Sequence, residues 1–392
     1  MRRYKKVLAG KVLLLLVLLS GGVAAAGCTG ALFGQVGWSG ATVADGSLFF
    51  GATGGKLVAL DTSNGNLLWS EEETFKTSSS GGFLGCAPQA AAVAFYGTPA
   101  VSGELVYISG YNGKVYAFNT ASGALRWVYP REGSLAGPII GGPVISQGRV
   151  YIGSDDGMVY ALDAATGDSV WQFEIGDKIW STPVVYGNTL FIGSSDKKLY
   201  ALDATTGQQK WQQPFEAQGP IVSTPLVYND MVYVASFDRH LYALDAISGE
   251  LIWTFPSDDA DENRPQKWFW ASPIVYDNTI YAPSMDGRVY VLDAESGILV
   301  TSINLDGAIS SSPVVVDGKV IVVTEEGKIY SIDTANNQKS IIATLQTSED
   351  KEAKIYAPLS ASNGLVYIHS QEGVLYEVDV QTRVARQLYP IG

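Results

Sequence analysis

Short apolar segments and turns alternate along most of the chain. Residues 181–211 and 223–253 follow the same plan: an apolar segment, a turn, a second apolar segment, a turn, a third apolar segment that ends in Asp, a Thr/Ser-Gly turn, and a last segment that ends in Trp. Short apolar segments between turn residues are typical of β-strands. Each unit therefore predicts four strands.

Two landmark positions indicate that this unit occurs eight times. The first is a proline in the first segment, with Ala41 in its place in the first copy: Pro99, Pro143, Pro183, Pro225, Pro273, Pro313 and Pro358. The second is an acid that ends the third segment, with Asn119 in its place in the second copy: Asp61, Asp163, Asp203, Asp245, Asp293, Asp333 and Asp379. The landmarks lie 20 residues apart in seven copies and 21 apart in the last. This constancy indicates an internal structural repeat.

The predicted strands are apolar on both faces, as at residues 190–192 and 241–244. Four-stranded units that are buried on both faces and recur every ~40–45 residues are what a β-propeller requires. Proline cannot donate to a strand ladder, so its place in the first segment suits an edge strand beside the central channel. We therefore predict an all-β, eight-bladed β-propeller with four antiparallel strands per blade over residues 38–392.

The acid landmark opens a turn, as in residues 163–167, where the carboxylate can accept backbone N–H groups and Gly takes a positive φ. The pattern A-x-D-A-x-[TS]-G-x-x-x-W resembles the tryptophan-docking repeat of pyrroloquinoline-quinone (PQQ) propellers, over roughly residues 38–390. The resemblance implies that each Trp stacks on a turn of a neighbouring blade. The docking residues would then be Trp69, Trp127, Trp171, Trp211 and Trp253, with Asp61, Asp163, Asp203 and Asp245 in the turns. Thr301, Ile341 and Gln387 replace Trp in the last three copies, where we expect differently packed and weaker joints.

The N-terminus has the features of an export signal. Basic residues up to Lys11 precede an apolar segment at 12–19 and then small residues,. The sequence Ala25-Ala26-Gly27-Cys28 resembles the bacterial lipobox, which implies lipidation of Cys28, although Leu is usual in that family where Ala25 stands. We predict a signal peptide at 1–27 and a lipid-anchor linker at 28–37. An uncleaved membrane anchor and ordinary secretion remain alternatives, and no charge between residues 12 and 44 opposes an anchor,.

Composition and charge narrow the class of function. The chain is 46% hydrophobic and 17% charged, which excludes a disordered chain or a coiled coil, and two histidines leave little room for His-based acid–base chemistry,. Removal of residues 1–27 takes away five basic residues and no acid, which leaves 21 basic and 39 acidic residues and a net charge of −18. Such a surface repels nucleic acid. With Cys28 acylated, Cys86 is the remaining thiol, either buried or available for an intermolecular cross-link,.

A quinone-dependent dehydrogenase is one alternative function. The PQQ dehydrogenases, which resemble this chain in their blades, hold calcium, an acidic base and often a vicinal disulfide beside the quinone. This chain has no Cys-Cys pair and no C-x-x-C-H haem motif. Its acids form no grouping distinct from the turn positions. We therefore expect no enzyme activity, no catalytic or cofactor-binding residue and no cofactor.

One segment resembles the opening of a calcium-binding loop. Asp259, Asp261 and Asn263 match the D-x-D-x-N pattern, but Arg264 stands where that loop has Gly and Trp270 where it has Glu,. We interpret the segment as a solvated acidic loop and assign no metal site. His240 and His369 lie far apart in the sequence, and we interpret both as structural.

The connections between blades vary in length and predict a binding face. The intervals from each acid landmark to the next proline are 38, 24, 20, 22, 28, 20 and 25 residues, so every insertion falls in the same kind of connection. All such connections emerge on one face of a propeller, which makes that face the expected binding surface. The candidate partner-binding residues are Glu71, Glu72, Glu73, Trp38, Trp180, Trp268, Phe269 and Trp270.

Trp38, Trp180 and Trp270 each stand three residues before the first landmark. That position begins the innermost strand, near the channel mouth on the same face. The three indoles are either interface anchors or plugs that close the channel against one another.

Export signal, lipobox-like Cys28 and PQQ-like blades together resemble the BamB family, the lipoprotein B of the outer-membrane β-barrel assembly machinery. The resemblance implies a non-enzymatic, membrane-anchored scaffold on the outer side of the cytoplasmic membrane or in the outer membrane facing the periplasm. Its partner would be another envelope protein, and we expect a monomer within a hetero-complex. A surface module that binds glycan or another ligand through Trp38, Trp180 or Trp270 is a second alternative. The sequence does not name the partner or the membrane.

Overall fold

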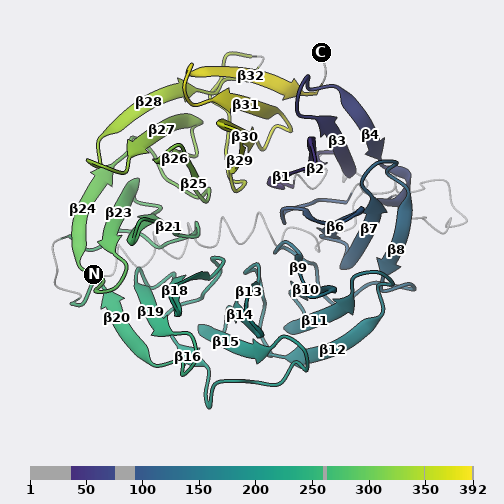
Figure 1. The fold of residues 1–392 in the computed structure, drawn as a ribbon, viewed down its shortest axis with the longest axis horizontal. Helices are drawn as coiled ribbons and strands as arrows, with labels where there is room; N and C mark the ends of the chain where they lie inside the picture. The colour runs from purple at the N-terminus through teal and green to yellow at the C-terminus, as the bar shows by residue number, and fades with distance from the viewer. Residues whose placement is uncertain (1–36, 76–92, 259–262, 348, 391–392) are drawn as a thin grey trace, which may run out of the picture. The chain divides into compact units, whose positions relative to one another are not determined.

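Eight four-stranded antiparallel sheets surround a common axis (Figure 1). This architecture is seen in a computed structural model that describes residues 37–75, 93–258, 263–347 and 349–390. Each sheet consists of four strands that are consecutive in the sequence, and the strand nearest the axis comes first. The predicted all-β, eight-bladed propeller with four antiparallel strands per blade is confirmed.

Blades 1 to 4 contain the first sixteen strands and one 3-10 helix. Their bounds are β1 (Ala41–Ala44), β2 (Ser47–Ala52), β3 (Lys56–Asp61), β4 (Leu67–Glu71), η1 (Glu73–Phe75), β5 (Ala100–Ser102), β6 (Leu105–Gly110), β7 (Lys114–Asn119), β8 (Leu125–Tyr129), β9 (Val144–Ser146), β10 (Arg149–Gly153), β11 (Met158–Asp163), β12 (Ser169–Glu174), β13 (Val184–Tyr186), β14 (Thr189–Gly193), β15 (Lys198–Asp203) and β16 (Phe215–Glu216).

Blades 5 to 8 contain the remaining sixteen. Their bounds are β17 (Leu226–Tyr228), β18 (Met231–Ala235), β19 (Leu241–Asp245), β20 (Leu251–Phe255), β21 (Ile274–Tyr276), β22 (Thr279–Pro283), β23 (Arg288–Asp293), β24 (Leu299–Asn304), β25 (Val314–Val316), β26 (Lys319–Val323), β27 (Lys328–Asp333), β28 (Lys339–Thr344), β29 (Ser360–Ser362), β30 (Leu365–His369), β31 (Leu375–Asp379) and β32 (Val384–Tyr389).

The landmark prolines stand directly before the inner strands. In blades 2 to 7 the inner strand begins one residue after the proline, as β13 does after Pro183, whereas in blade 1 Ala41 itself pairs with Phe50. An alanine has the N–H that a ladder position needs and a proline does not. In blade 8, β29 begins two residues after Pro358, so Leu359 occupies the landmark position. The interval of 21 residues from Pro358 to Asp379 therefore does not reflect a longer blade: Pro358 stands one residue before the landmark position, and the spacing from Leu359 to Asp379 is 20 residues, as in the other seven blades.

Apolar side chains between adjacent blades form eight core clusters, one at each joint. The cluster between blades 3 and 4, for example, includes Tyr151, Ile179 and Ile192, all fully buried. Burial of apolar surface on both faces of every sheet is the main stabilising term for such a ring. The eighth cluster joins Leu48 and Phe50 of blade 1 to Leu375 of blade 8. The ring therefore closes through side chains, with no strand exchanged between the first and last blades.

Five of the joints also carry a docked tryptophan. The Trp127 indole N–H donates to the Ala164 carbonyl at 2.9 Å, and its ring covers Gly167 in the turn of the next blade. The same arrangement joins Trp69 to Gly123, Trp171 to Gly207, Trp211 to Gly249 and Trp253 to Gly297. In each turn the landmark acid or Asn119 accepts backbone N–H bonds, as Asp245 does from Ile247 and Ser248. The bonds from the Ser248 backbone and hydroxyl lower the pKa of Asp245.

Every turn that an indole covers has glycine at its positive-φ position. Where Thr301 and Ile341 replace Trp, the next turns have Asn337 and Arg383 at the positive-φ position, with φ of 59° and 60°. A Cβ fits these turns because no indole lies on them. At the joint between blades 8 and 1, Leu388 approaches Gly65 instead.

Candidate functional site

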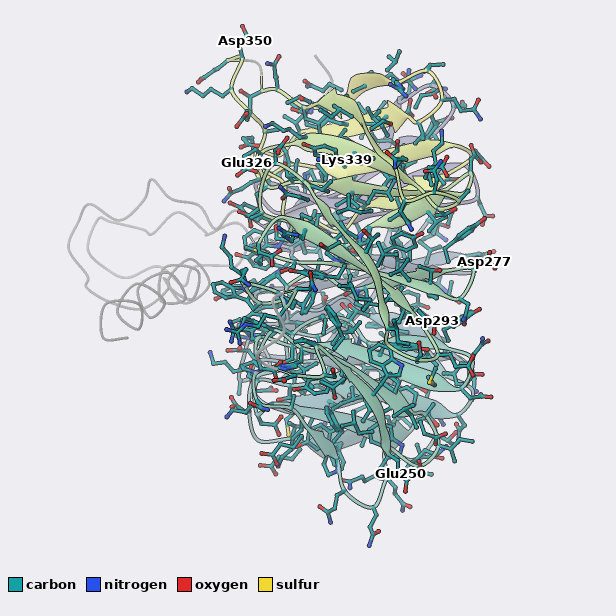
Figure 2. All side chains as sticks on the ribbon, turned by 90° about the vertical axis from the view of Figure 1, so that its left-hand side faces the viewer. Glu250, Asp277, Asp293, Glu326, Lys339 and Asp350 are labelled. Carbon is teal, nitrogen blue, oxygen red and sulfur yellow. The ribbon has the colours of Figure 1, made fainter. Side chains whose placement is uncertain are left out.

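The connections between blades and the turns between second and third strands form one face, which we call the insertion face. Seven backbone hydrogen bonds join the two sets of loops in a regular series: Tyr111 N–H to Ala94, Asp155 to Pro138, Ser195 to Lys178, Phe237 to Pro220, Met285 to Trp268, Glu325 to Ala308 and Gln371 to Lys354. In the edge-on view of Figure 2, Glu326 and Asp350 lie on this face and Asp277 and Asp293 on the other. The described parts of the insertions therefore share one face, as the interval pattern predicts.

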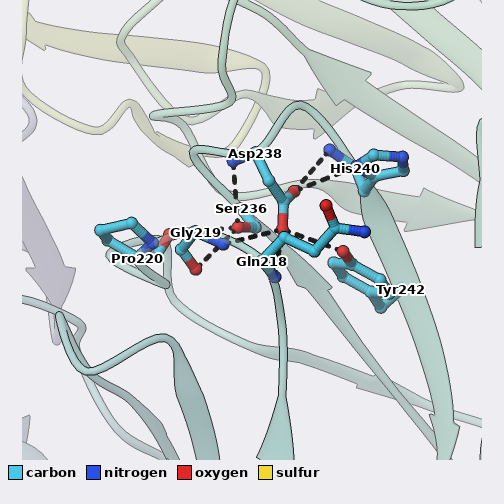
Figure 3. Close-up of polar contacts among 7 residues, drawn as sticks. All are labelled: Gln218, Gly219, Pro220, Ser236, Asp238, His240 and Tyr242. Carbon is cyan, nitrogen blue, oxygen red and sulfur yellow. Dashed lines mark hydrogen bonds and ion pairs between the residues drawn. The ribbon is translucent and has the colours of Figure 1, made fainter. Parts of the chain in front are cut away.

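A serine–aspartate–tyrosine motif holds the insertion-face turns together. In blade 5, Asp238 Oδ2 accepts from Gln218 N–H (2.8 Å), Gly219 N–H (3.0 Å) and Tyr242 Oη–H (2.9 Å), as Figure 3 shows. Ser236 Oγ donates to the Gly219 carbonyl at 3.0 Å. Burial raises the pKa of Asp238, but bonds from its neighbours, His240 foremost, outweigh this effect and lower the pKa overall. The second-to-third-strand turn of blade 5 thus holds in place the connection that leads from blade 4 into blade 5.

Replacement of Asp238 by asparagine is expected to lower the free energy of unfolding by about 2 kcal/mol, because an amide NH₂ at the Oδ2 position cannot accept these three bonds. Asp196→Asn is the matched control: among the described residues its carboxylate accepts from Tyr200 Oη–H and the Lys198 backbone N–H, and we expect about half the loss,. Denaturant unfolding of the two variants measures the difference. Equal losses would show that the bonds to residues 218 and 219 contribute nothing.

The same motif recurs in three other blades, and the sequence shows it. The pairs Asp156–Tyr160, Asp196–Tyr200 and Asp286–Tyr290 each have the tyrosine hydroxyl within 2.6–2.9 Å of the carboxylate. The spacing S-x-D-x-x-x-Y is the signal in the sequence from which this motif could have been predicted. It marks the second-to-third-strand turn.

Trp38, Trp180 and Trp270 lie on the insertion face where the innermost strands begin, close to the central axis. All three are half-buried and contact other aromatic rings. The Trp38 ring lies 4.6 Å from Tyr96 and 5.4 Å from Tyr356, measured between centroids. Trp180 lies 6.5 Å from Trp270, although blade 5 separates their blades in the sequence, so both side chains reach toward the axis. The indoles thus pack on one another while retaining exposed surface.

Three aromatic neighbours were missed by the sequence analysis. Tyr96 occupies the same position as Trp38, three residues before Pro99, and Tyr356 does so once Leu359 is taken as the landmark. Phe237 is the first residue of the second-to-third-strand turn of blade 5. Its ring centroid lies 5.6 Å from that of Trp270. The signal for Tyr96 was present in the sequence. The signal for Tyr356 was hidden by the one-residue shift in blade 8.

Trp268 and Phe269 have different environments. Trp268 is half-buried and lies 6.0 Å from Phe237. Phe269 is 0% exposed and packs 6.1 Å from Tyr290 within the core between blades 5 and 6. The assignment of Phe269 to a partner surface was therefore wrong: alternate residues of this segment point in opposite directions, and Phe269 points inward.

Glu71, which ends β4, and Glu72, which follows it, have local partners. Glu71 Oε1 accepts from Thr74 N–H at 2.8 Å, and Glu72 forms an ion pair with Lys56 at 3.1 Å. Glu73 begins η1. Cys28, Cys86, Asp259 and Asp261 lie outside the described residues.

Asp155 and Glu325 both stand at the first position of a second-to-third-strand turn, and their surroundings differ. Asp155 accepts from Trp180 Nε1–H at 2.7 Å and pairs with Lys178 Nζ at 3.1 Å. Glu325, four blades further along the ring, forms no ion pair with any described residue. The nearby Ser310 hydroxyl donates to the Ile355 carbonyl at 3.3 Å. Burial and the neighbouring Glu326 raise the pKa of Glu325.

No group of three or more His, Cys, Asp or Glu side chains in the described part of the chain is arranged to hold a metal ion. No helix in the described ranges has the length and apolar character needed to cross a bilayer.

Comparisons with known proteins agree with this architecture. The family described as "Outer membrane protein assembly factor BamB" matches residues 20–137, 74–178 and 155–386. The crystal structure of BamB from Moraxella catarrhalis has a TM-score of 0.67 at 18% identity, over 86% of this chain and 95% of that one. The computationally designed Ika8 protein has a TM-score of 0.68 at 17% identity, over 88% and 96%. No curated protein matches the sequence.

At these identities the two structures show the fold alone, whereas the family match extends over nearly the whole propeller. The chain therefore belongs to the family of the outer membrane protein assembly factor BamB.

Proposed function

We propose that this chain is an exported, lipid-anchored, non-catalytic scaffold that binds another envelope protein during outer-membrane protein assembly. The single observation that carries the proposal is the family match over residues 20–386. The lipid anchor would be attached at Cys28, after removal of the signal at 1–27. The protein would act as one copy within a hetero-complex, in the outer membrane facing the periplasm or on the outer side of the cytoplasmic membrane.

The insertion face is the surface we assign to the partner. It presents half-buried tryptophans at its axial end, and protein interfaces are enriched in such aromatic anchors surrounded by a polar rim. Of the candidate residues, Trp38, Trp180, Trp268 and Trp270 retain exposed surface there. The net charge of −18 predicted for the mature chain disfavours nucleic acid as the partner,.

The ring packing favours a protein over a glycan. A sugar stacks on a free, flat aromatic face, but the faces and edges of Trp38 are shared with Tyr96 and Tyr356. Trp270 is similarly flanked by Trp180 and Phe237. Such tilted clusters suit side chains that insert between rings.

Photo-cross-linking in cells tests the proposal. We expect a photoreactive residue at the exposed position Lys267 on the insertion face to capture an envelope protein, and one at Glu250, exposed on the other face, to capture none. Mass spectrometry of the cross-linked band identifies the partner. Equal capture from both positions, or capture from neither, would contradict the assignment of this face.

A further inference from the structure

The third-to-fourth-strand turn of blade 1 has the form of an indole-docking turn. In the five docked turns the tryptophan ring covers a glycine, and its N–H donates to the carbonyl three positions before that glycine, as Trp171 covers Gly207 and donates to Ala204. The acceptors in the other four turns are Thr120, Ala164, Ala246 and Ala294. Blade 1 has Thr62 and Gly65 at these two positions.

The backbone of this turn already has the docking conformation. The φ of Gly65 is 76°, within the range of 69° to 78° found for the five covered glycines. The Gly65 N–H donates to the Asp61 carbonyl at 2.8 Å, and the Asp61 carboxylate accepts from the Ser63 N–H at 2.7 Å. The docked turn of blade 4 has the same two bonds, at 2.8 and 3.0 Å. An indole can therefore bind to blade 1 without rearrangement of the backbone.

No described residue places an indole on this turn. Beyond the neighbours of Gly65 in the chain, Leu388 Cδ2 is the one described atom within 4 Å of a Cβ added at this glycine, at 3.1 Å. At Gly207 the added Cβ would lie 2.7–3.1 Å from three atoms of the Trp171 ring. No described residue donates to the Thr62 carbonyl. Both contacts that an indole would make are thus available.

The tryptophans of this chain all have other positions. Five of the nine are docked, and the remaining four lie on the insertion face: Trp38, Trp180, Trp268 and Trp270. The third-to-fourth-strand turns lie on the opposite face, where Figure 2 places Asp293. A second copy of the chain would have its tryptophans in the same positions. An indole for blade 1 must therefore come from a different protein.

Blade 1 differs from the two other blades whose turns no indole covers. The turns of blades 7 and 8 have Asn337 and Arg383 where the docked turns have glycine. A Cβ at this position stands where the indole ring lies in the docked turns. Of these three turns, that of blade 1 is the one that can receive a flat ring.

The turn is accessible at the outer rim of the joint between blades 8 and 1 (Figure 1). Gly65 is half-buried, whereas Gly207 beneath its indole is buried. Leu67 and Leu68, which follow the turn, are 44% and 48% exposed, and residues 381–387 of blade 8 are all exposed. The two leucines provide apolar surface that a bound segment can cover.

We propose that the blade 1 turn binds a tryptophan side chain of another protein, with its ring on Gly65 and its N–H bonded to the Thr62 carbonyl. This contact is separate from the insertion face and from the partner assigned to that face. Tryptophan fits better than phenylalanine, because it supplies a large apolar ring together with an N–H donor for the carbonyl.

The test uses the full-length chain in detergent micelles and a displayed library of random twelve-residue peptides. We expect the wild-type protein to enrich peptides with one common tryptophan. Synthetic forms of the best peptide with benzothienylalanine at that position, in which sulfur replaces the N–H, should bind about five-fold more weakly. Gly65→Ala should weaken the tryptophan peptide about ten-fold, because the added Cβ stands where the ring would lie. Gly148→Ala, with φ of 73° and nothing within 4 Å of its Cβ, should leave the affinity unchanged.

Enrichment of peptides without tryptophan, or equal binding of the tryptophan and benzothienylalanine forms, would overturn the inference. So would full binding by Gly65→Ala, whose circular dichroism shows whether the variant is folded. If it does not fold, the comparison of the two peptides decides the question on the wild-type protein alone. Cross-linking from position 267 reports on the insertion face separately, so failure of the tryptophan site leaves the scaffold function intact.

Discussion

Replacement of Gly207 by alanine is expected to lower the free energy of unfolding by about 3 kcal/mol. Gly207 has a φ of +74°, and an added Cβ would lie 2.7 Å from the Trp171 ring that covers the turn. The variant therefore combines an unfavourable backbone conformation with displacement of a docked indole. Denaturant unfolding monitored by tryptophan fluorescence and circular dichroism measures the loss.

Gly148→Ala is the matched control for this prediction. Its φ is +73°, almost the same, but nothing lies within 4 Å of the added Cβ. We expect a loss of about 1 kcal/mol from the backbone alone. In a Trp171→Ala background, Gly207→Ala should cost no more than this control. A full 3 kcal/mol loss in that background would show that the indole is not the source of the effect.

Acid conditions are expected to destabilise the ring through His369. The side chain is 1% exposed at the joint of blades 8 and 1, and its Nδ1–H donates to the Ser39 carbonyl at 2.9 Å. Burial lowers the pKa of His369 to about 4 from an ordinary value of 6.5. Between these values the unfolded chain binds a proton that the folded chain does not, so stability falls as pH falls from 6.5 to 4. The total loss from this group is about 3 kcal/mol.

His369→Asn tests this assignment, because the asparagine NH₂ can donate to the Ser39 carbonyl without titrating. We expect the wild-type protein to lose about 3 kcal/mol more than the variant between pH 7 and pH 4, with the difference developing below pH 6.5. Comparison of the two proteins removes the contribution of carboxylates, which titrate in both. Parallel pH profiles would show that His369 does not control acid stability.

The sequence predicts this fold well because its local signals act independently. A proline at an inner edge, an acid that closes a turn, and a glycine under an indole each depend on a few neighbouring atoms, and each recurs at fixed spacing. The register of blade 8 was misassigned because Pro358 lies one residue from the landmark position. A proline can precede an edge strand at more than one distance, so only the strand pairing decides.

The candidate site could be predicted less completely. Trp38, Trp180 and Trp270 stand at a repeated position, and the sequence places them at one end of the axis. Phe269 is buried, whereas its neighbours Trp268 and Trp270 are half-buried. Residue type alone does not distinguish an inward from an outward aromatic side chain. Glu326 and Glu372 stand where blades 3 to 6 have an aspartate, and the effect of this difference is seen only when the bonds of Tyr330 and Tyr376 are known.

The manner of ring closure has a mechanical consequence. Blades 8 and 1 are joined by apolar contacts and by the bond from His369, and no backbone–backbone hydrogen bond links them among the described residues. The described chain enters at the inner strand of blade 1 and ends at the outer strand of blade 8. A pulling force applied between a membrane tether and a captured partner would thus act first on this joint. Blades 8 and 1 would separate there before the strands within any sheet separate.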